Sequence, residues 1–199
     1  MTITENRPAA SEAARRAMID SQLRTSGVNE PWVLAAMNRV PREDFVPEGA
    51  RAAAYTDRAV PLGHGRFLAA PLVHGRLLTE AAPSPDDKAL LVGDGQGYLA
   101  ALLRPLVGSL DAVDPAAAKD FAGHGTYSLI VIDGAIEELP QALAAALAEG
   151  GRIVTGLVER GVTRLAAGTR AAGDVALLPL AELGIPVLPE FAAPKRWSF

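Results

Sequence analysis

The sequence predicts an α/β protein built around a mostly parallel sheet that ends in an antiparallel hairpin. Short apolar segments at 89–93 and 128–133 each lead into a helical segment, and a third at 151–158 follows a helix. Such runs are typical of strands buried on both faces, and strands that alternate with helices indicate a parallel sheet. The segment 162–183 has the pattern of two strands joined by a turn at 172–174, which predicts the antiparallel end.

The first part of the chain predicts helices. One helix is expected over 12–27, and a second opens at Asn29, a suitable N-cap residue, with Pro31 in its first turn. A third, over 70–81, carries one apolar stripe that we expect to be buried. The stripe consists of Leu72, Val73, Leu77 and Leu78.

Length and composition predict one domain, with a helical and loop region at 12–80 and the sheet core at 88–199. The chain has 199 residues, of which 49% are hydrophobic and 21% charged, as in a soluble globular protein. A net charge of −4 argues against nucleic acid as a partner. Neither a signal peptide nor a long apolar run is visible, so we expect no membrane contact and a cytoplasmic location.

The side chains that could bind metal are few. The chain has no cysteine, and His64, His74 and His124 lie too far apart in sequence for a familiar metal motif, so we expect no metal site. His74 is expected to be packed or at the surface, and His124 to be solvated. Trp32 and Trp197 are expected to be anchors in the core or at an interface, because aromatic residues make up only 5% of the chain.

The strongest chemical signal is the loop Gly93-Asp94-Gly95-Gln96-Gly97 between a predicted strand and a helix that opens at Tyr98. Glycines remove Cβ atoms where a ligand must approach the backbone, although a tight structural turn has the same need. Asp114 follows Gly97 at close to the spacing of about 20 residues at which an acid holds a ribose. The GxGxG spacing favours S-adenosylmethionine over a dinucleotide.

A second acid, Asp133, ends the predicted strand 128–133. Ligands of α/β proteins bind at the carboxyl ends of the strands, so this side chain could face cofactor or substrate. It could equally cap a helix that begins near Glu137, where the pair Glu137 and Glu138 fits the first turn of a helix.

These motifs resemble, in order and over about residues 17 to 158, the protein-L-isoaspartate O-methyltransferases. The resemblance implies a Rossmann-like, S-adenosylmethionine-dependent methyltransferase fold and methyl transfer to the carboxylate of isoaspartyl residues in proteins. It also implies which residues bind the cofactor S-adenosylmethionine. These are Gly93, Asp94, Gly95, Gly97, Tyr98 and Asp114.

The loop 63–71, which reads GHGRFLAAP, departs from that family. The family loop usually reads Gln-Thr-Ile-Ser before one residue and a proline, so both hydroxyls are replaced here. Arg66 could clamp a substrate carboxylate through two hydrogen bonds; alternatively, Arg66 points to solvent and Phe67 and Leu68 pack into the core. His64 lies where the family loop also has histidine, and is either catalytic or held by backbone hydrogen bonds.

The connector 115–127 is the second departure. The family has a helix and a third strand between the ribose acid and the next strand of the sheet. This connector is about as long as a single crossover of about 10 to 12 residues, so it leaves no room for that strand. Strand 109–114 should then be the edge of the sheet, covered by residues 116–127, by the N-terminal helix, or by a second copy in a homodimer. The losses leave two hypotheses: an altered methyltransferase, or an inactive homologue that acts as a binding or regulatory module.

Overall fold

A computed structural model describes residues 7–193 of the chain. The chain divides into two compact units, residues 1–79 and residues 80–199, which we call the N-terminal and the C-terminal unit. Among the described residues, no helix is long and apolar enough to span a membrane. Trp197 lies outside the described residues.

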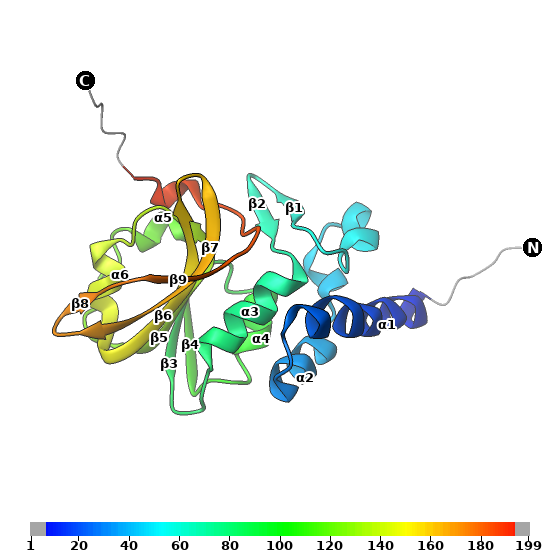
Figure 1. Cartoon of the computed structure of the whole chain (residues 1–199), viewed down its shortest axis with the longest axis horizontal. Coiled ribbons are helices and arrows are strands. Elements are labelled where there is room, and N and C mark those ends of the chain that lie inside the picture. The colour runs from blue at the N-terminus through cyan, green and yellow to red at the C-terminus, as the bar shows by residue number, and fades with distance from the viewer. Residues whose placement is uncertain (1–6, 194–199) are drawn as a thin grey trace, which may run out of the picture. The chain divides into compact units, whose positions relative to one another are not determined.

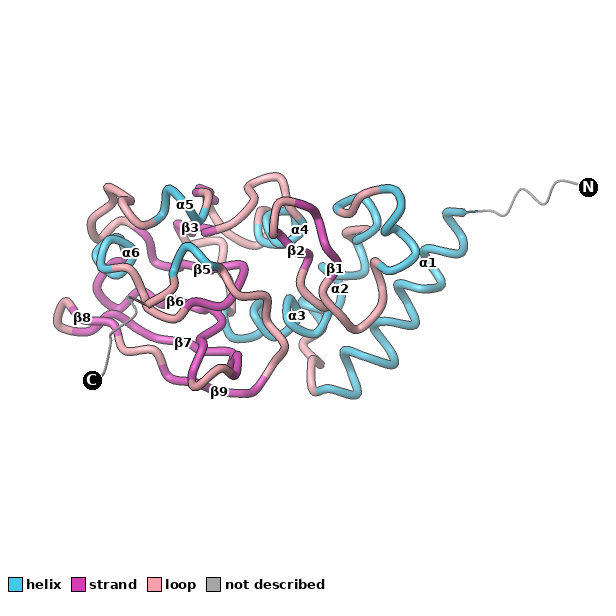
Figure 2. The backbone as a smooth tube through the Cα atoms, turned by 90° about the horizontal axis from the view of Figure 1, so that it is seen from above, coloured by secondary structure: helices cyan, strands magenta, loops and turns pink. Residues whose placement is uncertain are grey.

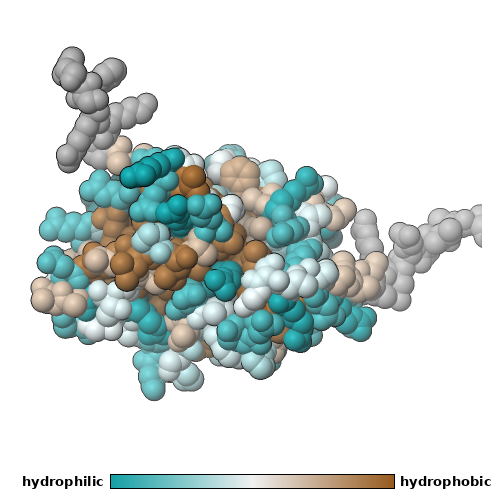
Figure 3. All heavy atoms as spheres, viewed as in Figure 1, coloured by the Kyte–Doolittle hydropathy of each residue, from teal (hydrophilic) through white to brown (hydrophobic). Residues whose placement is uncertain are grey.

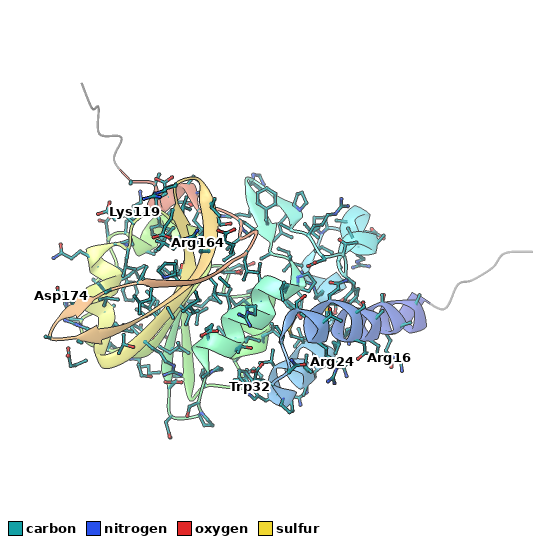
Figure 4. The ribbon with its side chains drawn as sticks, viewed as in Figure 1. Arg16, Arg24, Trp32, Lys119, Arg164 and Asp174 are labelled. Carbon is teal, nitrogen blue, oxygen red and sulfur yellow. The ribbon has the colours of Figure 1, made fainter. Side chains whose placement is uncertain are left out.

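The N-terminal unit begins with two helical segments (Figure 1). Helix α1 (Arg7–Met18) continues through a π-helical turn and a 3₁₀ turn, and the segment ends at Gly27, whose φ of 85° suits a glycine after a helix. Helix α2 (Pro31–Arg39) has Pro31 in its first turn, as predicted. The predicted N-cap was one residue early, because Glu30, not Asn29, occupies that position. Trp32 on α2 is half-buried (Figure 4).

The rest of this unit consists of short 3₁₀ turns, a hairpin and a helix. The hairpin pairs β1 (Val60–Gly63) with β2 (Arg66–Leu68). Helix α3 (Pro71–Ala81) follows, and its apolar stripe is buried as predicted except that Leu72 is half-buried. His74 of this helix is packed and fully buried.

The C-terminal unit contains the predicted sheet. Strands β3 to β6 pair in parallel, and β7 pairs with β6 and with β9 in antiparallel fashion. The order is β4-β3-β5-β6-β7-β8, with β9 also paired to β7. The strands are β3 (Lys88–Val92), β4 (Ser109–Val113), β5 (Tyr127–Ile136), β6 (Leu147–Glu159), β7 (Val162–Ala171), β8 (Asp174–Val175) and β9 (Leu178–Glu182).

The antiparallel hairpin is confirmed. Ala172 and Gly173 have φ values of 55° and 87°, which is the conformation of a two-residue hairpin turn. Asp174 follows this turn at the tip of the hairpin (Figure 4). Apolar side chains gather over β7 and β9 on the face shown in Figure 3, where Leu178 and Leu180 are exposed.

Three short helices accompany this sheet: α4 (Tyr98–Leu103), α5 (Pro115–Ala118) and α6 (Gln141–Ala146). Helices α4 and α6 lie on opposite faces of the sheet (Figure 2). A cluster of buried side chains, including Ile130 and Ile132 of β5, Leu143 of α6 and Phe191, forms the core of this unit.

The helix expected to begin near Glu137 and to precede the strand 151–158 is shorter than predicted, since α6 covers only Gln141–Ala146. Glu137 and Glu138 precede α6, and their backbone N–H groups donate to the carbonyl of Phe191. At the other end, Leu147 already pairs with Tyr127 at the start of β6. Strand pairing therefore overrides the helix propensity of this alanine-rich segment.

Strand β4 is the edge of the sheet, as the short connector predicts. It pairs with β3 on one side, and no strand among residues 7–193 pairs with its other side. The prediction that the family's additional strand outside β4 has no counterpart here is therefore confirmed for residues 7–193.

Candidate functional site

The glycine loop, residues 93–97, joins the carboxyl end of β3 to α4 as predicted. The backbone N–H of Gly93 donates to the carbonyl of Val113 on β4, and the N–H of Gly97 donates to the carbonyl of Asp94. Asp94 Oδ1 accepts a hydrogen bond of 2.8 Å from the N–H of Gln96. These bonds fold the loop into a tight turn against the edge strand.

Two glycines of this loop pack closely against neighbouring strands. A Cβ atom on Gly95 would lie 2.9 Å from the Cβ of Ala112, and one on Gly93 would lie 3.1 Å from the Cβ of Asp133. Both distances are shorter than ordinary van der Waals contact. Replacing Gly95 would therefore disturb its packing against β4 whether or not a ligand binds.

Asp114 follows β4 directly and caps α5. Its Oδ1 accepts a hydrogen bond of 2.8 Å from the N–H of Ala116, and the residue is exposed. Because β3 and β4 are parallel neighbours, Asp114 and the glycine loop both lie at the carboxyl ends of these strands. The predicted pair of glycine loop and acid is thus brought together, and its role in binding a ribose stays a prediction.

Asp133 lies beside Gly93 on the neighbouring strand. It does not end its strand as predicted, since β5 continues to Ile136 after an irregularity in the pairing between Val131 and Ala135. The alternative that it caps a helix near Glu137 was wrong, because α6 begins at Gln141. Its position at the glycine loop leaves the interpretation as a ligand-facing acid in place.

Tyr98 opens α4 as predicted, but its side chain is only 2% exposed. The ring is therefore part of the buried core of this unit.

The acceptor loop, our name for residues 63–71, belongs to the N-terminal unit. His64 is exposed at the turn of the β1–β2 hairpin with a φ of 51°. Arg66 is half-buried and takes part in an interaction. Neither a clamp by Arg66 nor catalysis by His64 is tested by these positions.

The two residues after Arg66 point to opposite faces of β2, as in any strand. Phe67 is 45% exposed, whereas Leu68 is 3% exposed. The expectation that both pack into the core was therefore wrong for Phe67. The acceptor loop presents an aromatic ring, in place of a hydroxyl, to its surroundings.

Sequence reasoning missed a buried pair beneath this loop. Arg42 and His74 are both fully buried, and Arg42 Nη1 lies 3.1 Å from His74 Nδ1. Arg42 also donates to the carbonyl of Ala69 in the acceptor loop. No local motif marks this pair, because the partners lie 32 residues apart.

The connector packs against the start of β5. The ring of Phe121 lies 5.9 Å from the ring of Tyr127, and the ammonium of Lys88 lies 5.2 Å from the centre of the Tyr127 ring. The connector also borders a hollow of about 730 Å³ beside α6. Its lining includes Lys119, Phe121, His124, Glu138, Gln141 and Phe191. His124 is exposed, as expected.

Comparison with known proteins identifies the family. The model of the protein-L-isoaspartate(D-aspartate) O-methyltransferase family matches residues 13–114. A protein-L-isoaspartate O-methyltransferase 1 of Rhodopseudomonas palustris is 33% identical, and the match covers 81% of this chain and 77% of the relative. A relative from Methanoculleus marisnigri is 30% identical over 89% of this chain and 92% of its own length. The chain belongs to the protein-L-isoaspartate O-methyltransferase family.

Solved structures agree on the fold of this family member. The crystal structure of a putative protein-L-isoaspartate O-methyltransferase from Plasmodium falciparum in complex with S-adenosyl-L-homocysteine superimposes with a TM-score of 0.70 at 19% identity. It covers 90% of this chain and 98% of that one. The predicted Rossmann-like methyltransferase fold is therefore confirmed.

Proposed function

We propose that the protein transfers a methyl group from S-adenosylmethionine to the carboxylate of isoaspartyl residues in proteins. The observation that carries this proposal is the glycine loop beside Asp114, at the carboxyl ends of two adjacent parallel strands, in a chain of this family. The relatives from Rhodopseudomonas palustris and Methanoculleus marisnigri are named for this activity.

The cofactor would be held by the C-terminal unit. The backbone of the glycine loop and the carboxylates of Asp114 and Asp133 lie at one edge of the sheet, and Asp114 is exposed there. An exposed carboxylate suits the hydroxyl groups of a ribose, so the residues present fit this group. S-adenosylmethionine would supply a methyl group on a positively charged sulfur.

The protein's own task would be alignment of the substrate. A carboxyl group with a pKa near 4 is already ionised at neutral pH, so its attack on the methyl group needs no general base. Alignment of the reacting atoms can contribute several kcal/mol, and loss of a loop hydroxyl could reduce the rate by about 10² to 10³. We therefore propose an altered acceptor loop that supports slow transfer, with Arg66 as the candidate contact for the carboxylate.

A second candidate is an inactive homologue that binds a protein or peptide. The acceptor loop presents Phe67 in place of a hydroxyl, and no strand among residues 7–193 lies outside the edge strand β4. The hollow beside α6 offers this module a place for a ligand. This candidate predicts binding of a partner without any methyl transfer.

Two measurements on the full chain separate the candidates. Calorimetric titration with S-adenosylhomocysteine tests the cofactor site, and tritium transfer from labelled S-adenosylmethionine to an isoaspartyl peptide tests the reaction. Binding of S-adenosylhomocysteine together with slow methyl transfer supports the methyltransferase. Binding of S-adenosylhomocysteine without methyl transfer supports the inactive module. Absence of both binding and transfer removes the proposed cofactor site.

A further inference from the structure

The Arg42 guanidinium joins three segments of the N-terminal unit. Its Nε donates to the carbonyl of Ala54 at 2.8 Å, and its Nη2 donates to the carbonyl of Ala69 at 2.7 Å. Its Nη1 lies 3.1 Å from Nδ1 of His74 on α3. The planar guanidinium directs these bonds along fixed directions, so the three segments are held in one arrangement.

The contact between Arg42 and His74 fixes the state of the imidazole. Arginine can only donate hydrogen bonds and keeps its charge in proteins. His74 Nδ1 must therefore accept, which makes the imidazole neutral with its hydrogen on Nε2. Since both residues are fully buried, this acceptor is held in place beside the guanidinium.

We propose that Arg42 is a positioning residue for the acceptor loop and acts through the carbonyl of Ala69, with His74 as the anchor that orients the guanidinium. This inference rests on the proposed function, because that function makes residues 63–71 the loop that meets the substrate.

The position of Ala69 explains why its carbonyl matters. Ala69 follows β2 directly and is 2% exposed, whereas Phe67, two residues earlier, is 45% exposed. A shift of Ala69 would be transmitted along β2 to Phe67 and Arg66. A misplacement of about 1 Å at a substrate-positioning group can reduce a rate by about 10²-fold.

Hydrogen exchange of the backbone amides at 66–70 tests this inference directly. His74→Leu removes the acceptor while His74→Gln keeps one, and Arg58→Gln is a control on an exposed arginine of the same unit. We expect exchange at 66–70 to be about tenfold faster in His74→Leu, because one buried hydrogen bond to a charged group is lost. His74→Gln should restore most of the protection, and Arg58→Gln should leave it unchanged.

Arg42→Lys provides a second variant, since lysine keeps the charge but cannot reach three acceptors in a fixed plane. It should also loosen residues 66–70 and leave the exchange of the β3 and β5 amides unchanged. Unchanged exchange at 66–70 in both Arg42→Lys and His74→Leu would overturn the inference, as would a uniform increase over the whole N-terminal unit.

Kinetics add a readout that a purely structural role would not move. The kcat/KM for an isoaspartyl peptide should fall in His74→Leu, by up to about 10²-fold, and recover in His74→Gln, while the affinity for S-adenosylhomocysteine stays unchanged. An equal loss of cofactor affinity would contradict the inference. Absence of transfer by the natural chain would reject the proposed function, and the exchange experiment would still decide whether Arg42 positions the loop.

Discussion

The hydroxyl of Tyr127, at the start of β5, donates a hydrogen bond of 2.8 Å to Oδ2 of Asp111 on the edge strand β4. Burial, the hydrogen bond to Asp111 and the charge of that carboxylate together raise the pKa of Tyr127 to about 12. The bond spans β3, which lies between the two strands. It therefore ties the exposed edge of the sheet to its centre.

Tyr127→Phe should lower the free energy of unfolding by about 1 kcal/mol at neutral pH, since one hydrogen bond is lost and Asp111 keeps access to water. The folded pKa of the tyrosine is raised, so its contribution is present below pH 10 and is lost as the pH rises through about 12. Urea unfolding of both proteins from pH 8 to 12 measures this. A difference that grows with pH would contradict the assignment.

Asp87→Asn should lower stability by about 1 to 3 kcal/mol, because it weakens a largely buried ion pair. Arg152 Nη2 lies 2.6 Å from Asp87 Oδ2, and the Asp87 side chain is 6% exposed. Burial alone would raise the pKa of Asp87, but hydrogen bonds from Arg152 and Ser128 outweigh it and lower the pKa.

The contribution of Asp87 is therefore present above the pKa of the unfolded aspartate, near 3.9, and is lost as the pH falls through the lower folded pKa. Thermal unfolding between pH 2 and 7 should show a smaller acid-induced loss of stability in Asp87→Asn than in the natural chain. Asp86→Asn, on the exposed neighbour, should behave like the natural chain.

Asp114→Asn should weaken the affinity for S-adenosylhomocysteine about tenfold or more, because a charged acceptor for the ribose is lost. Asparagine is as good an N-cap as aspartate, so α5 keeps its cap and the effect reports the ligand. Calorimetry gives the affinity, and the melting temperature checks the fold. An unchanged affinity would show that the ribose does not bind to the carboxylate of Asp114.

Restoring the hydroxyls of the acceptor loop with Phe67→Thr and Ala69→Ser should raise methyl transfer to an isoaspartyl peptide by up to about 10²-fold. Phe67→Val is the matched control, because valine has the shape of threonine without the hydroxyl. Tritium transfer measures both. If the valine variant gains as much as the double variant, removal of the aromatic ring and not the hydroxyl is responsible.

A second copy of the chain at the β4 edge would give about twice the chain mass of 20.7 kDa in light scattering. If a second copy covers this edge, and not the connector or the N-terminal helix, Leu110→Lys on β4 should return the dimer to the monomer. Leu180→Lys, on the exposed strand β9, is the control. Loss of the dimer in Leu180→Lys alone would place the interface over β7 and β9.

The sequence predicted the sheet well because its strands are buried and their apolar runs stand out. Strand β3, the turn after β7 and the edge position of β4 all follow from local patterns or from the length of one connector. The end of helix α6 could not be predicted, since the alanines after Gln141 favour a longer helix while pairing between Leu147 and Tyr127 imposes a strand from Leu147 on.

In the candidate site, too, local motifs could be predicted and contacts between distant residues could not. The glycine loop and Asp114 are local motifs and were placed correctly, whereas the requirement for glycine at Gly95 comes from Ala112 across the sheet. The contacts of Arg42 with His74 and Ala69 join residues distant in sequence. No periodicity or spacing encodes such contacts.

The short connector also changes the order in which the sheet can assemble. Strands β3 and β5 are direct neighbours in the sheet, and only β4, two short helices and short loops separate them in the chain. Closing a shorter loop costs less entropy, and contacts between residues nearer in sequence form faster. We expect the centre of this sheet to nucleate folding earlier than it would with an additional strand and helix inserted between β4 and β5.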